Sequence, residues 1–215
     1  MKIKKIFENF QIPPGLQIHM YTVTGVGKYI CDNWIGEEID KHSVISALLI
    51  HDLGNLIKID LSPNNKIYDK ELIKPIWKDI KQELIDKYGS NAHHATVKMT
   101  KEITDDQKII GLINSMDSAD LEITSQKSWE EQICEYADMR VAINGVTTLE
   151  NRLDDIFNRY KDHFEEWADE ELLAKNKSFG KKIEAALQKN TNQDILNIPE
   201  EKIATYLVKL ADYEI

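Results

Sequence analysis

The sequence predicts an all-α protein, and three observations support this fold class. Apolar residues recur at spacings of three and four along most of the chain, strand-like alternation is scarce, and no internal repeat or low-complexity tract is present. With 215 residues, 42 % of them hydrophobic and 30 % charged, the chain can form one well-buried domain, alone or with a helical extension. We therefore expect a helical bundle.

The individual helices are predicted from periodicity and from the residues that interrupt it. A Pro-Pro-Gly turn at residues 13–15 precedes the first helix, Gly54 and Asn55 stop the second, and Pro75 breaks or kinks the third. The predicted helices span residues 16–34, 41–53, 69–88, 92–103, 105–114, 129–143, 148–164, 171–187 and 200–211. We expect a main helical domain over residues 1–164, with residues 165–215 forming a C-terminal helical extension packed on it.

Charge and composition exclude several classes of partner. A net charge of −10 argues against binding to nucleic acid polymers or to anionic membranes, and no stretch approaches the ~18 apolar residues of a membrane span. The N-terminal lysines are not followed by the apolar region of a signal peptide. Cys31 and Cys134 form no CxxC pair and are expected to be reduced, partly buried thiols. We expect a cytoplasmic protein and leave a homodimer open.

The most informative residues are His51 and Asp52, which end the apolar run Ala47-Leu48-Leu49-Ile50. Burying an ionised carboxylate costs several kcal/mol unless it is paired or binds a metal. A divalent cation would compensate for both side chains together, and the C-terminal end of the predicted helix 41–53 would present its negative dipole to that cation.

Two further ligand-type side chains face inward on other predicted helices. His19 shares an apolar stripe with Val23 and Val26, and Asp138 has Cys134 at i−4 and Val141 at i+3. A single core histidine is more often hydrogen-bonded than ligating, and a single inward aspartate is often a cap or an ion-pair partner. Four such groups in one core favour a metal site instead.

A set of two histidines and two aspartates limits the identity of the ion. Imidazole nitrogens and carboxylate oxygens suit Mn, Fe, Co, Ni, Zn or Mg, whereas the absence of cysteine pairs disfavours a structural zinc knot. The sequence therefore predicts one divalent metal ion held by His19, His51, Asp52 and Asp138.

Candidate substrate contacts lie close to these residues in sequence. Asn55 and Lys58 follow the His-Asp pair, and His93 has Thr96 and Val97 on its helical face, whereas His94 shares its face with lysines and is expected to be solvated. Whether His93 binds a second metal or hydrogen-bonds substrate is open. We predict that Asn55, Lys58 and His93 bind substrate.

Arginine is a further candidate, because its planar fork binds phosphate bidentately. The three arginines all follow Asp138, and Arg140 is predicted to bind substrate if the helix ends nearby, which Gly145 makes feasible. Arg152 and Arg159 share a helical face with Asp155, and they equally fit surface ion pairs.

Taken in order, His19, His51-Asp52 and Asp138 resemble the H…HD…D signature of the HD-domain superfamily of metal-dependent phosphohydrolases. The resemblance covers residues 14–160 and includes the segment His93-x-Ala95-Thr96. It implies an HD-domain-like all-α bundle with the metal between helices, and hydrolysis of phosphate esters, often nucleotides. The Gly-Tyr-Pro extension of cyclic-dinucleotide phosphodiesterases is absent from this sequence.

The sequence thus predicts a hydrolase that acts on a small phosphorylated substrate, with a nucleotide as one option, through a metal-activated water. Asp52 would be the catalytic residue, because it would both ligate the metal and orient the water. The alternative is a non-catalytic HD-fold module that senses a nucleotide or a metal. A di-iron oxygenase on the same scaffold and a purely helical scaffold protein are further alternatives.

Overall fold

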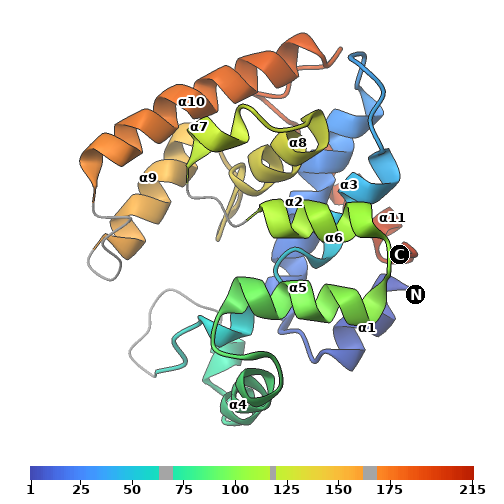
Figure 1. The fold of residues 1–215 in the computed structure, drawn as a ribbon, viewed down its shortest axis with the longest axis vertical. Helices are drawn as coiled ribbons and strands as arrows, with labels where there is room; N and C mark the ends of the chain where they lie inside the picture. The colour runs from blue at the N-terminus through green and yellow to red at the C-terminus, as the bar shows by residue number, and fades with distance from the viewer. Residues whose placement is uncertain (63–69, 117–119, 162–168) are drawn as a thin grey trace.

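The computed structural model describes residues 1–62, 70–116, 120–161 and 169–215, and it confirms the all-α fold class (Figure 1). Strands within these residues form one small hairpin, β1 (Val141–Ala142) and β2 (Gly145–Val146). The helices are α1 (Ile3–Asn9), α2 (Pro14–Asp32), α3 (Lys41–Ile50), α4 (Ile76–Tyr88), α5 (Ala92–Ile103), α6 (Gln107–Ser115), α7 (Leu121–Thr124), α8 (Trp129–Asp138), α9 (Leu149–Tyr160), α10 (Glu170–Lys189) and α11 (Glu200–Leu210), with 3₁₀ turns η1 (Asn55–Ile57) and η2 (Lys70–Ile73).

Three central helices, α2, α3 and α8, pack against one another and form the middle of the core. Every residue of α3 from Ser43 to Ile50 is buried, and a helix that is buried on all sides belongs inside the bundle. Gly27 allows α2 to lie close to α3, because a Cβ at this position would overlap the side chain of Leu48. Side chains on these three helices are therefore held firmly relative to one another.

The outer helices cover this core on several sides. Helix α6 packs on α3, and α5 lies between α6 and α4. Helix α10 crosses α7, α8 and α9 along one edge of the molecule, and α11 packs on α2 (Figure 1). Residues 169–215 thus lie against the bundle, while the predicted boundary at 164–165 falls outside the described residues.

Two predicted helices end earlier than expected, and both ends matter for the site. Helix α3 ends at Ile50 rather than at residue 53, and α8 ends at Asp138 rather than at residue 143. After α3 the chain turns into η1, and after α8 it enters the hairpin, where Gly145 has a φ of 106°. His51 and Asp138 consequently lie at helix ends rather than in helix interiors.

The remaining predicted helices agree with the structure to within two residues wherever the chain is described, except that residues 70–75 of the predicted helix 69–88 lie outside the α-helix, which begins at Ile76. Pro75 separates η2 from α4, as predicted, whereas the predicted start at residue 69 and the predicted end at residue 164 lie outside the described residues. Helices α1 and α7 were not predicted. Among the described residues, no helix combines the length and the apolar character that crossing a membrane requires.

Candidate metal centre

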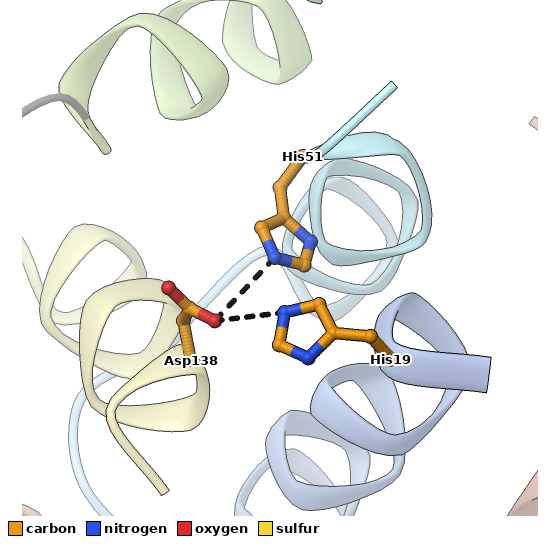
Figure 2. Close-up of side chains that lie close together, drawn as sticks. All are labelled: His19, His51 and Asp138. Carbon is orange, nitrogen blue, oxygen red and sulfur yellow. Dashed lines mark ion pairs between the residues drawn. The ribbon is translucent and has the colours of Figure 1, made fainter. Parts of the chain in front are cut away.

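Helices α2, α3 and α8 bring three ligand-type side chains to one point (Figure 2). His19 comes from α2, His51 caps the C-terminal end of α3, and Asp138 is the last residue of α8. The Asp138 Oδ1 atom lies 3.2 Å from His19 Nε2 and 3.6 Å from His51 Nε2. One ligand atom from each residue lies within 4.8 Å of the others, so the three form a candidate metal-binding group.

Asp52 lies beside the same two imidazoles. Its Oδ2 atom is 3.5 Å from His19 Nε2 and 3.8 Å from His51 Nε2. The structure therefore brings together all four side chains that the sequence proposed as ligands. The His51 side chain is only 3 % exposed, whereas the other three are 19–23 % exposed. The centre is thus anchored in the core and accessible to solvent through its other members.

Two atoms of this centre lack a hydrogen-bond partner in the part of the chain that the structure describes, as is expected of metal ligands. His51 Nε2 and Asp138 Oδ1 are buried, and neither has a hydrogen-bond partner among the described residues. Buried polar atoms are nearly always hydrogen-bonded, so a nitrogen and a carboxylate oxygen that face each other at 3.6 Å without a hydrogen bond call for an explanation. Two ligands at ~2.1 Å from one ion are about 3.0–3.4 Å apart in tetrahedral or octahedral geometry. The separation of 3.2 Å from His19 lies within this range, and the separation of 3.6 Å from His51 lies about 0.2 Å above it.

The backbone fixes the orientation of His51. Its Nδ1 atom lies 2.8 Å from the carbonyl oxygen of Leu48, one helical turn earlier. Because a carbonyl can only accept, Nδ1–H donates, and Nε2 presents its lone pair to the centre when the ring is neutral. Metal-binding histidines generally have such a backbone or carboxylate partner on the second nitrogen.

The electrostatics of the centre favour positive charge. Burial lowers the pKa of His51, but Asp52 and Asp138 raise it more, to a net pKa of about 9. Burial also raises the pKa of Asp138, yet the close contacts with the His19 and His51 imidazoles hold that pKa well below its ordinary value. The C-terminal ends of α3 and α8 add negative dipole ends at the same place. A cation would satisfy this field in place of protons on the imidazoles.

The two cysteines do not belong to the centre. Cys31 and Cys134 are free thiols, as the sequence predicted, and both are fully rather than partly buried. Burial raises the pKa of Cys31 to about 12 and the pKa of Cys134 well above its ordinary value. Burial thus favours the neutral thiol, and neither cysteine belongs to the candidate group, whose donors are nitrogen and oxygen.

The turn that follows His51 and Asp52 is held by α5. The backbone N–H of Gly54 donates to Thr96 Oγ1 at 2.9 Å, and that hydroxyl donates to the Ala92 carbonyl at 3.0 Å. Gly54 has a φ of −83°, so it does not have the left-handed conformation common at helix C-terminal glycines. Glycine is needed here because α5 approaches too closely for a side chain.

Replacing Gly54 by alanine is expected to lower the free energy of unfolding by about 1–3 kcal/mol, because the new Cβ would overlap the Ala92 carbonyl and lie 2.9 Å from the Thr96 nitrogen. Backbone atoms cannot rotate away as a flexible side chain can. The control is Gly111→Ala in α6, where a Cβ meets nothing within 4 Å among the described residues. Gly111→Ala should be neutral or stabilising. Urea unfolding of both variants measures the difference, and equal stabilities would contradict this account of Gly54.

The predicted substrate residues near the His-Asp pair have different environments. Asn55 is buried at the start of η1, and Lys58 is exposed just after it. His93 is half-buried in the first turn of α5 and His94 is exposed, so the two histidines differ as predicted. Helix α5 packs on η1, which places His93 on an element next to the one that carries Asn55. Their roles in substrate binding stay predictions.

The prediction for Arg140 needs correction. Its side chain is buried, and all three guanidinium nitrogens donate within the protein: Nε to the Thr147 carbonyl, Nη1 to the Tyr136 hydroxyl and the Ile195 carbonyl, and Nη2 to the Leu196 carbonyl. A guanidinium engaged in this way is not available to a substrate phosphate. Arg152 and Arg159 both pair with Asp155, at 3.1 and 2.6 Å, in agreement with the ion-pair alternative.

Sequence reasoning missed two supporting groups. The carbonyl of Leu48 could have been found from helical spacing, since it lies three residues before His51. The hydroxyl of Thr96 lies in a segment that the sequence had singled out, but nothing in its spacing indicated that it would bind the backbone of Gly54.

Fold and site together define an all-α protein with a candidate metal-binding group of two histidines and an aspartate, beside which lies a second aspartate. Comparison with protein-family models, with curated proteins and with solved structures gives no match. Membership of the HD-domain superfamily therefore stays a prediction from the sequence.

Proposed function

We propose that this protein is a metal-dependent phosphohydrolase that acts on a small phosphate ester, with nucleotides as one substrate class. His19, His51, Asp52 and Asp138 would hold a divalent metal ion. The observation that carries the proposal is that His51 Nε2 and Asp138 Oδ1 are buried, lie 3.6 Å apart, and have no hydrogen-bond partner among the described residues. The order of the four residues along the chain, which resembles the HD-domain signature, supports it.

The residues of the chain have separate tasks in this mechanism. A divalent cation held here would lower the pKa of a coordinated water and polarise a phosphoryl oxygen. His19 and His51 would supply imidazole nitrogens to the ion, and the Leu48 carbonyl keeps the His51 ring oriented. Asp52 has a second carboxylate oxygen that can accept a hydrogen bond from the attacking water and hold it in line with the phosphorus. We therefore assign the catalytic role to Asp52.

Substrate contacts would come from the segments beside the centre. The exposed ammonium of Lys58 suits a phosphate oxygen, while the amide of Asn55 and the imidazole of His93 can hydrogen-bond an ester or a sugar. Arg140 is not among them, because its guanidinium is already engaged.

The test is metal analysis of the purified protein together with an activity screen. The chain should bind about one divalent ion and hydrolyse a generic phosphomonoester with added Mn²⁺, Co²⁺ or Ni²⁺, losing activity on chelation and regaining it on reloading. A panel of nucleotides, sugar phosphates and cyclic nucleotides then defines the substrate. A protein that binds no divalent ion would contradict the proposal, and two irons per chain would favour a di-iron oxygenase.

A second candidate is a non-catalytic module that senses a nucleotide or a metal. The internal engagement of Arg140 favours it, because Lys58 is then the single cationic residue left among the predicted substrate contacts. A bound metal without turnover over the whole phosphate panel would support this alternative.

A further inference from the structure

Tyr136 and Arg140 flank Asp138 in sequence, two residues before it and two residues after it. Positions two apart on a helix are rotated by about 200°, so the Tyr136 side chain points away from that of Asp138, whereas Arg140 lies just beyond the end of α8. Both are buried, and the Arg140 Nη1 atom donates to the Tyr136 hydroxyl. The end of α8 therefore has two opposite faces, one with Asp138 toward the candidate metal centre and one with this hydrogen-bonded pair.

The face with Tyr136 and Arg140 is fixed to the C-terminal part of the chain. The Tyr136 hydroxyl donates to Glu184 Oε2 of α10 at 2.8 Å, and the Glu184 carboxylate lies 3.9 Å from Arg140 Nη1. Arg140 also donates to the carbonyls of Ile195 and Leu196, which follow α10. One guanidinium thus connects α8 to two segments that are about 50 residues away in sequence, and its charge is balanced by Glu184.

The same arginine also closes the turn after α8. Its Nε atom donates to the Thr147 carbonyl at 2.6 Å, and its own carbonyl accepts from the Thr147 nitrogen at 2.7 Å. Helix ends fray because their last carbonyls lack helical partners. Asp138 is the last residue of α8, so the position of its carboxylate depends on how well this end is held.

We propose that Arg140 is a positioning residue for the metal centre: it holds Asp138 at its place opposite His19 and His51, using carbonyls supplied by residues 195–196. The inference rests on the proposed metal site. Through these carbonyls, residues 195–196 would support ion binding, although they contribute no ligand to the group described above.

The experiment compares metal affinity in the full-length wild type, Arg140→Lys and Tyr136→Phe, using Mn²⁺ and Co²⁺ in competition with a chromophoric chelator. Arg140→Lys keeps the positive charge but loses the planar guanidinium with its several hydrogen-bond donors, and Tyr136→Phe keeps the ring but loses the hydroxyl. We expect Arg140→Lys to lower the affinity for both ions by about 10–100-fold, because loss of a group that orients a ligand typically has this effect. Tyr136→Phe should lower both affinities less. The visible absorption spectrum of bound Co²⁺ should change in both variants, because it reports coordination geometry.

The control is Leu84→Ala, which removes buried apolar contacts in α4, a helix that packs on α5 and η1. It lowers stability without touching α8 and should leave the Co²⁺ spectrum and both affinities as in the wild type. Wild-type affinity and spectrum in a folded Arg140→Lys or, if that variant does not fold, in Tyr136→Phe would overturn the inference and leave the metal site standing. A wild type that binds neither ion would overturn both.

Discussion

Replacing His51 by alanine is expected to abolish metal binding and, with it, hydrolysis. His51 contributes the most buried side chain of the centre, and its ring orientation is set by the Leu48 carbonyl. Without the imidazole, Asp52 and Asp138 would retain only His19 between them. We expect the dissociation constant for Mn²⁺ or Co²⁺ to rise by more than about 100-fold, since even groups that only support a ligand contribute 10–100-fold. Equilibrium dialysis with metal analysis measures the loss.

The matched control for this substitution is His94→Ala. His94 is an exposed histidine on α5. Its replacement by alanine removes the same side chain from the surface instead of from the core. It should bind metal and turn over substrate like the wild type. If His51→Ala keeps its metal, or if both histidine variants lose it equally, the assignment of His51 as a ligand is wrong.

Replacing Asp52 by asparagine is expected to lower kcat by on the order of 100- to 1,000-fold while changing KM little. An asparagine has nearly the same shape, but its amide lacks the negative charge that the mechanism uses to orient and deprotonate the water. The Asp52 Oδ2 atom lies near both imidazoles, so some loss of metal affinity is expected as well, and assays at saturating metal separate the two effects.

Asp79→Asn is the control for Asp52→Asn, because Asp79 is exposed in the first turn of α4. It should retain the wild-type kcat. An Asp52→Asn variant with unchanged kcat at saturating metal would exclude Asp52 as the catalytic residue and would leave it as a ligand at most.

The helices and the proximity of the four candidate ligands could be predicted because both follow from local spacing. Helices α2, α5 and α11 have apolar residues at three and four over three turns or more, and this pattern alone locates them. His19, His51, Asp52 and Asp138 were found because each lies on an apolar face, where an unpaired polar group is expensive. Proximity in space then followed from inward orientation on different helices.

Features that depend on distant contacts could not be predicted in this way. Helix α1 has only seven residues, and the Ile3 nitrogen donates to the Tyr213 carbonyl, more than 200 positions away. The hairpin has two residues in each strand, too few for an alternating pattern. The partners of Arg140 come from residues 195–196, so its internal role was invisible from a sequence that placed it near Asp138.

The ligand side chains come from three helices that are far apart in the sequence, and they meet only when the bundle is assembled. An ion held by them would bind the native chain and not the unfolded one. By mass action such an ion would stabilise the native chain by about 2.7 kcal/mol at a free concentration of 100 times its Kd. Depletion of the ion would then reduce the amount of native protein as well as its activity, which would couple the lifetime of this chain to the supply of its metal.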